Sequence, residues 1–130
     1  MKKIVGLLLA VVLLMITLSS CSAFEKDPED FMSTLEDAGF YVELMDTQRK
    51  IKDIAEDFDI RERFIRHIEC IVFCENEEEG YFIFCENTST AKDITESLEE
   101  QRKYQWRIQR KGKIVYIGSE ENWIVAREYF

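Results

Sequence analysis

The chain has 130 residues, among them 17 Lys or Arg and 26 Asp or Glu, which give a formal net charge of −9 at pH 7. This length suffices for one small domain with a single hydrophobic core. Because nucleic acid selects basic protein surfaces, the acidic balance argues against nucleic acid as a partner.

The N-terminal segment has the three parts of a secretory signal. Lys2 and Lys3 form a basic start, residues 4–18 form an apolar run, and small residues follow. The run has about fifteen residues, whereas a permanent membrane-spanning helix needs roughly twenty. The segment therefore predicts export from the cytoplasm, with residues 1–20 as the signal peptide.

The end of this segment, Leu18-Ser19-Ser20-Cys21, resembles the lipobox of bacterial lipoproteins. The resemblance implies that the Cys21 thiol receives a diacylglycerol and that signal peptidase II cuts just before this residue. It also implies attachment to the extracytoplasmic face of the cell membrane, with residues 21–27 as the lipidated cysteine and its tether. Residues 28–130 then form a single domain. The alternative, an uncleaved N-terminal anchor, also places the domain outside the cytoplasm.

The mature part of the chain is more acidic than the whole. Loss of Lys2 and Lys3 leaves 15 basic residues against 26 acidic ones, a net charge of −11. Anionic lipid headgroups repel such a domain, so we expect it to stand away from the membrane on its tether. The expected partners are the membrane, through the N-terminal lipid, and an unknown envelope protein or ligand. No cofactor is expected.

Residues 28–66 are predicted to contain a helix, a strand and a second helix. Asp27 and Pro28 suit a helix start, Gly39 suits its end as a left-handed cap, and residues 40–44 suit a strand. Apolar residues at helical spacing then predict a helix over about residues 48–58. A charged connection follows, although the same periodicity also allows one helix to continue to about residue 65.

Residues 67–75 and 81–86 predict a β-hairpin around an acidic turn at residues 76–80. Its register pairs Cys70 with Cys85. The face of the first strand that carries Cys70 and Cys74 has no acidic residue, so we expect it to face the core. A Cys70–Cys85 disulfide is one hypothesis, because disulfides are permitted outside the cytoplasm. The alternative is three buried free cysteines.

The last third of the chain predicts a helix, a second hairpin and a final helix. Thr88 or Thr90 is expected to cap a helix that runs to about residue 103, and Ser119 to cap the last one. Residues 104–109 and 113–117 predict strands joined at Lys111-Gly112. This register gives one shared face to four apolar residues, Trp106, Ile108, Val115 and Ile117.

The order of these elements predicts an α+β domain. Its small antiparallel sheet is expected to consist of two hairpins and one further strand, with helices packed mainly on one face. The pattern also resembles small uncharacterised lipoproteins of Gram-positive bacteria, in which a Gly-Phe or Gly-Tyr strand, a Phe-rich strand and a late Gly-Lys hairpin recur. That resemblance implies a fold rather than an activity.

The residue types that most often carry catalysis or bind metals do not converge in the predicted fold. His67, the only histidine, is expected on the strand face opposite Cys70, which disfavours a Cys–His nucleophile pair. Zinc needs three or four converging ligands, and the acidic turn lacks the spacing of a calcium-binding loop. No catalytic residue and no metal site is therefore assigned.

Two features suggest a candidate binding surface. Tyr116 lies on the strand face opposite Trp106, where an aromatic side chain is expected to be exposed. Basic residues gather nearby, and they either receive an anionic partner or balance the acidic residues within the molecule, which we favour. They are Arg102, Lys103, Arg107, Arg110, Lys111 and Lys113.

Three hypotheses for the function follow. The first is a membrane-tethered, non-enzymatic domain that binds or scaffolds another envelope component. The second is a tethered enzyme or redox protein that works through Cys70, Cys74 or Cys85, which requires a reactive thiol with a low pKa. The third is a domain that binds a small ligand or a peptide in an exposed aromatic pocket.

Overall fold

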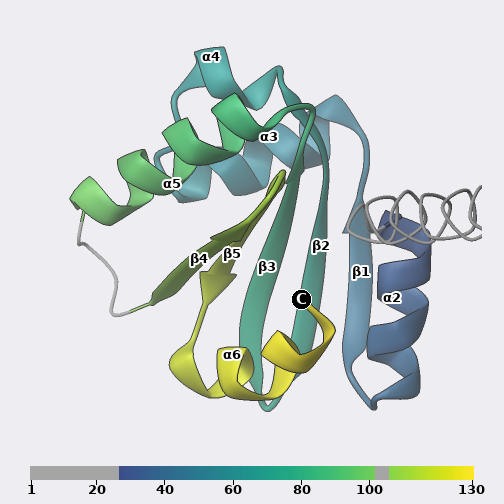
Figure 1. Ribbon diagram of the computed structural model, residues 1–130. Helices are drawn as coiled ribbons and strands as arrows, with labels where there is room; N and C mark the ends of the chain where they lie inside the picture. Colours follow the sequence, from purple (N-terminus) through teal and green to yellow (C-terminus); the bar gives the residue numbers. More distant parts are fainter. Residues whose placement is uncertain (1–26, 102–105) are drawn as a thin grey trace, which may run out of the picture.

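The computed structural model describes residues 27–101 and 106–130. Within these ranges, five strands form one antiparallel sheet in the order β1-β2-β3-β5-β4 (Figure 1). The strands are β1 (Tyr41–Met45), β2 (Ile68–Asn76), β3 (Glu78–Cys85), β4 (Arg107–Lys111) and β5 (Ile114–Gly118). The helices are α2 (Pro28–Asp37), α3 (Gln48–Asp57), α4 (Glu62–Ile65), α5 (Thr88–Gln101) and α6 (Glu120–Ala126), followed by a 3-10 turn, η1 (Arg127–Tyr129). The predicted α+β fold, with two hairpins and one further strand, is confirmed.

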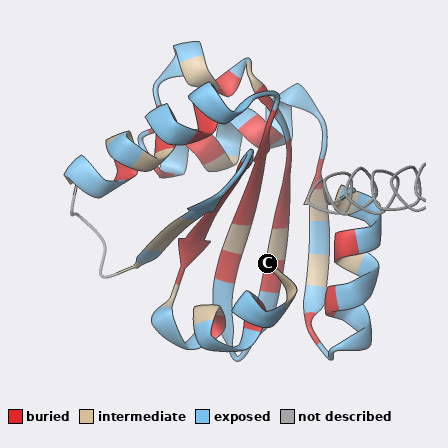
Figure 2. Cartoon of the chain, viewed as in Figure 1, coloured by how far each residue is buried: buried red, intermediate tan, exposed pale blue. Residues whose placement is uncertain are grey.

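Helices cover both faces of the sheet, whereas the sequence led us to expect them mainly on one. The helices α3, α4 and α5 pack with Ile71 and Ile83 into one hydrophobic cluster, the α3/α4/α5 layer. The helices α2 and α6 pack with Val72 and Phe82 into a second cluster, the α2/α6 layer. Both faces of the central strands are therefore buried (Figure 2). Strands with apolar residues at almost every position are typical of sheets covered on both sides.

Side-chain caps begin several of the helices. Thr47 caps α3, and Ser119 caps α6 as predicted. For α5 the cap is Asn87 rather than Thr88 or Thr90, because the Asn87 Oδ1 accepts a hydrogen bond from the Thr90 N–H at 2.7 Å. Asparagine is among the most favourable residues at this position, since its side chain satisfies an amide that has no partner within the helix.

Residues 46–66 form two helices rather than one. Helix α3 ends at Asp57, and Asp59 then adopts a left-handed backbone conformation with a φ of 54°. That conformation interrupts a right-handed helix, and Asp is one of the few residues that tolerate it. The short helix α4 occupies the segment that the sequence suggested as a charged connection.

In the second hairpin, β4–β5, the apolar side chains lie on the predicted face, but the residues that pair across the two strands differ from the predicted ones. Its loop is Gly112-Lys113, one residue later than expected, so Ile108 pairs with Ile117 instead of Val115. Moving the turn by one residue shifts the partners by two, and a shift of two keeps each side chain on its face. Ile108 and Ile117 therefore lie in the α3/α4/α5 layer, where the pattern placed them.

Candidate functional site

The three cysteines of the described residues are free and buried. The β2–β3 register differs from the predicted one by a single residue, so Cys70 pairs with Phe84. Cys85 pairs with Ile68 across an irregularity in β2. Cys70 consequently lies in the α2/α6 layer and Cys85 in the α3/α4/α5 layer. The hypothesis of a Cys70–Cys85 disulfide is wrong, because the sheet separates the two thiols, and the alternative of three buried free cysteines describes the structure.

Burial also makes these thiols poor nucleophiles. It raises the pKa of Cys70 to about 11 and the pKa of both Cys74 and Cys85 to about 12. The thiolate is the reactive form of cysteine, and at neutral pH these groups are almost entirely protonated. This environment is typical of structural cysteines and disfavours the hypothesis of a cysteine-dependent redox protein or enzyme.

Tyr116 is buried, and the expectation that it belongs to an exposed binding surface is wrong. Its ring packs in the α2/α6 layer, and its hydroxyl donates to the Asn122 Oδ1 at 2.8 Å. Gly80 and Gly118 make room for that hydroxyl, since a Cβ on Gly118 would lie 2.5 Å from it. The sequence argument failed because the face opposite Trp106 is covered by α6 rather than by solvent.

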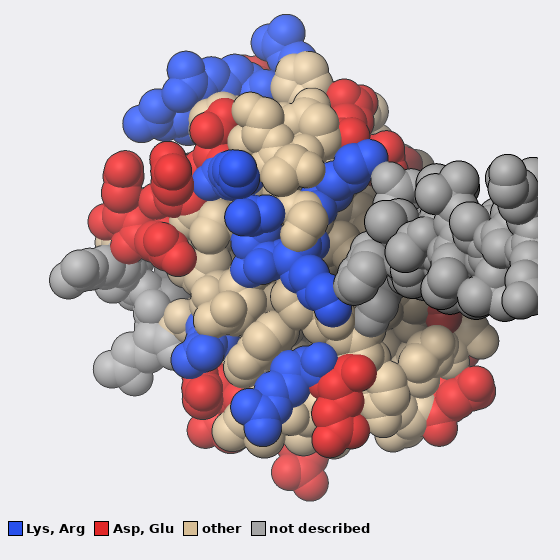
Figure 3. Space-filling view, in the orientation of Figure 1, with Lys and Arg blue, Asp and Glu red and all other residues tan. Residues whose placement is uncertain are grey.

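The predicted basic residues are exposed but make contacts within the chain. The Arg107 Nη1 lies 3.6 Å from the Glu120 Oε2. The Arg110 Nη1 donates to the Gly112 carbonyl oxygen at 3.1 Å, and the Lys111 Nζ donates to that of Phe130 at 2.9 Å. On the face drawn in Figure 3, Lys and Arg gather across the middle, and Asp and Glu lie over the helices around it. The contact of Arg107 with Glu120 pairs opposite charges within the chain, whereas those of Arg110 and Lys111 are to backbone carbonyl oxygens.

Other predicted residues fall outside the described ranges. Cys21, the predicted lipidation site, is one of them, and Arg102 and Lys103 of the basic group are two more.

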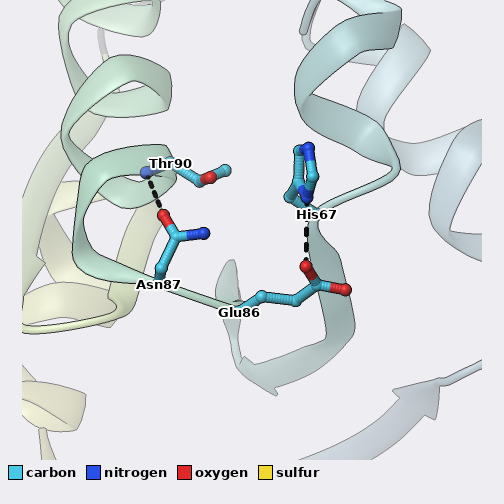
Figure 4. Close-up of polar contacts among 4 residues, drawn as sticks. All are labelled: His67, Glu86, Asn87 and Thr90. Atoms are coloured by element: carbon cyan, nitrogen blue, oxygen red, sulfur yellow. Dashed lines mark hydrogen bonds and ion pairs between the residues drawn. The ribbon is translucent and has the colours of Figure 1, made fainter.

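A hollow with a volume of about 550 Å³ lies between α4 and α5. His67 stands on one side, and its Nδ1 lies 3.0 Å from the Glu86 Oε2 (Figure 4). The start of α5 lies on the other side, where the Asn87 side chain caps the helix by accepting a hydrogen bond from the Thr90 N–H. The side chains of His67 and Glu86 are about half exposed, at 45% and 49%. Solvent screens such a pair, so it contributes little to stability.

Opposite charges line the two walls of this α4–α5 cleft. Arg61 and Arg63 lie on the α4 side, whereas Asp93, Glu96 and Glu100 lie on α5. Within the described residues, the hydrogen bond of the His67 ring is to Glu86, not to a hydroxyl or a thiol that the ring could activate. The cleft has the character of an open polar surface rather than of an assembled nucleophile–base pair.

A second surface consists of four aromatic side chains, which we call the aromatic row: Tyr41, Phe73, Tyr81 and Trp106. Ring centroids lie 6.3 Å apart for Tyr41 and Phe73, 5.1 Å for Phe73 and Tyr81, and 6.4 Å for Tyr81 and Trp106. Buried Phe58, just after α3, contacts Tyr81 and Trp106 edge-on and joins the row to the core. Tyr41 is 61% exposed, and the other three rings are half-buried.

Strand register explains how the aromatic row forms. Glu43 in β1 pairs with Phe73 in β2, and Phe73 pairs with Tyr81 in β3. Tyr41 pairs with Glu75 and therefore lies on the same face, diagonally from Phe73. The row thus crosses three adjacent strands on the sheet face that α3, α4 and α5 cover elsewhere.

Comparison of the chain with protein-family models, with curated proteins and with solved structures finds no match.

Two absences concern the residues that the structure describes, 27–101 and 106–130. None of the helices within these ranges combines the length and the apolar character that crossing a bilayer requires. Across residues 27–101 and 106–130, no group of three or more His, Cys, Asp or Glu side chains is arranged to hold a metal ion.

The sequence reasoning missed the aromatic row, and it placed Trp106 only on the apolar face of the second hairpin. The signal was present, because Phe73 shares its strand face with Glu75, and a mixture of aromatic and acidic residues is typical of a partly exposed surface. Tyr81 and Tyr41 reach the same face only through pairings between strands that are distant in sequence. Local periodicity does not specify those pairings.

Proposed function

We propose that the chain is a membrane-tethered extracytoplasmic lipoprotein whose domain binds another envelope component and does not catalyse a reaction. The lipobox-like segment that ends at Cys21 supports the tether. The aromatic row supports binding, and it is the observation that carries the proposal. Aromatic side chains held by a rigid sheet provide contact area at a low cost in conformational entropy, and they are enriched at protein interfaces.

The thiols support a binding role over the redox alternative. A cysteine enzyme needs an accessible thiolate, whereas Cys70, Cys74 and Cys85 are buried and protonated at neutral pH. The acidic surface also disfavours nucleic acid as the bound component.

One experiment tests both halves of the proposal. The full chain is expressed in the cells that produce it, with a photoreactive amino acid in place of Tyr41, and compared with the same substitution at exposed Glu99 on α5. We expect the Tyr41 position to give a discrete crosslinked species in the membrane fraction and the Glu99 position to give none. A Cys21→Ala variant should leave the membrane fraction or retain its signal peptide, and should lose that crosslink.

Two results would contradict the proposal. A Cys21→Ala variant that stays in the membrane at the mature mass would refute the lipid tether. Equal crosslinking from Tyr41 and Glu99 would refute binding through the aromatic row.

A further inference from the structure

We propose that the aromatic row binds an extended polypeptide segment that bears lysine or arginine side chains. This inference rests on the proposed binding function and specifies the class of partner. Three observations carry it: the exposure of Tyr41 with the partial exposure of the other rings, the charge of the hollow beside them, and the spacing of the rings across the sheet.

Carboxylates surround the hollow next to the aromatic row. It has a volume of about 340 Å³, and Phe73 and Tyr81 form part of its lining. Glu43, Asp53 and Glu79 contribute three negative charges to the lining, against one positive charge from Lys50. Glu75, which pairs with Tyr41 across the strands, adds a carboxylate beside the aromatic row. The hollow therefore has an excess of negative charge at the surface of two aromatic rings.

The carboxylates near the hollow also affect the Tyr81 hydroxyl. Its pKa is raised by burial first and then by the nearby carboxylates of Glu79, Asp57 and Glu43. Burial disfavours a charge of either sign, but the carboxylates that disfavour a phenolate here attract a cation.

Aromatic rings and carboxylates together select a particular ligand chemistry. The face of an aromatic ring attracts a cation through its quadrupole, and a neighbouring carboxylate adds a direct ionic contact. Lysine and arginine satisfy both, and their apolar stems also cover ring surface. An anionic or purely apolar ligand would leave Glu43 and Glu79 desolvated without a partner.

The spacing of the rings favours a polypeptide over an isolated small cation. Side chains on one face of an extended chain repeat at roughly 6.5–7 Å. Consecutive ring centroids of the aromatic row lie 5.1–6.4 Å apart. An extended segment that crosses the strands can therefore place successive basic side chains over successive rings.

Binding is measured by calorimetry on the full chain in a non-ionic detergent. The probe is a decapeptide that alternates lysine with glycine, so that all lysines share one side of the extended chain. Control peptides replace lysine by glutamate or by neutral citrulline. We expect the lysine peptide to bind, the two controls not to bind, and the affinity to fall as salt is raised.

The whole domain is acidic and attracts any cationic peptide. Matched variants are therefore needed to distinguish binding at the aromatic row from this general attraction. Glu43→Gln with Glu79→Gln should weaken binding about fivefold to tenfold. Glu36→Gln with Glu99→Gln removes the same charge from exposed sites on α2 and α5 and should change the affinity less than twofold.

Two single variants test the contributions of the Tyr41 ring and of the Lys50 side chain. Tyr41→Leu keeps an apolar side chain but removes the most exposed ring, and should weaken binding about threefold. Lys50→Gln removes the one cation that lines the hollow and should strengthen binding about twofold.

The outcomes separate this inference from the proposed function. Failure of the lysine peptide to bind would overturn the inferred partner class, while crosslinking at Tyr41 would still support a binding role. Equal weakening by the two double variants would show attraction to the whole acidic surface and would also overturn the inference.

Discussion

Asn122 connects α6 to both hairpins of the sheet through its side-chain amide. The Oδ1 accepts hydrogen bonds from the Tyr116 hydroxyl at 2.8 Å and from the Cys74 thiol at 3.5 Å. The Nδ2 donates to the Glu78 carbonyl oxygen at 2.9 Å. The residue is 1% exposed, so each of these polar groups would lack water as a substitute partner.

We expect Asn122→Ala to lower the free energy of unfolding by about 2 kcal/mol, because it removes hydrogen bonds to buried partners. Urea denaturation followed by circular dichroism measures the change. Glu121→Gln, at the preceding exposed position of α6, is the matched control and should stay within about 0.5 kcal/mol of the original chain. An Asn122→Ala variant as stable as that control would show that the network contributes nothing.

At the scale of the elements, the β2–β3 hairpin depends on a single strained residue. Glu77 lies between the paired residues Asn76 and Glu78 and has a φ of 64°. Side chains with a Cβ are disfavoured in this left-handed region, and glycine is not. The turn also concentrates like charges, since its neighbours Glu75, Glu78 and Glu79 are acidic.

Glu77→Gly should therefore raise the free energy of unfolding, by about 0.5–1 kcal/mol after the added flexibility of glycine in the unfolded chain is included. Glu77→Ala removes the same charge but keeps the strain, so the difference between the two variants measures the relief of strain less the entropy cost of glycine. Thermal and urea unfolding of both variants provide the values. If Glu77→Gly is no more stable than Glu77→Ala, the cost of the left-handed conformation does not exceed the entropy cost of glycine, which contradicts the prediction.

The same turn shows why the sequence predicted the elements better than their pairing. Apolar runs bounded by turn residues located all five strands, and Ser119 marked the start of α6. The acidic turn contains Gly80, which suggested a longer loop, but the chain turns at Glu77 instead. A displacement of one residue was enough to separate Cys70 from Cys85, because neighbouring positions of a strand face opposite sides.

The binding surface was harder to predict than the fold, for a related reason. The aromatic row requires the antiparallel pairing of β1 with β2, whereas the sequence specified only adjacent hairpins. Tyr116 illustrates the opposite error. The predicted hairpin correctly placed Tyr116 on the face opposite Trp106. However, α6 covers that face, and local periodicity cannot predict such a contact between distant elements.

At the scale of the whole molecule, the buried thiols link stability to alkaline pH. In an unfolded chain they ionise near their ordinary pKa of 9.0, whereas in the folded chain the values are about 11 for Cys70 and about 12 for Cys74 and Cys85. Above pH 9 the unfolded chain thus releases protons that the folded chain retains. Their contribution to stability is complete below pH 9 and is lost as pH rises towards 12.

We therefore expect the free energy of unfolding to decrease between pH 9 and pH 11, as measured by urea denaturation at a series of pH values. Burial also raises the pKa of Tyr116, which acts in the same direction. Cys85→Val removes one of these thiols while filling the site with an apolar side chain, and its stability should decrease less over this interval. A decrease as steep in Cys85→Val as in the original chain would assign the pH dependence to other groups.

The division of the core into two layers gives the cysteines a practical use. Cys70 and Cys74 lie in the α2/α6 layer and Cys85 lies in the α3/α4/α5 layer, so each side of the sheet contains its own native thiol. A buried thiol reacts with an alkylating reagent only when its surroundings open, and regions of one protein can open separately. The order in which the three sites become modified therefore reports which layer opens first, without any introduced label.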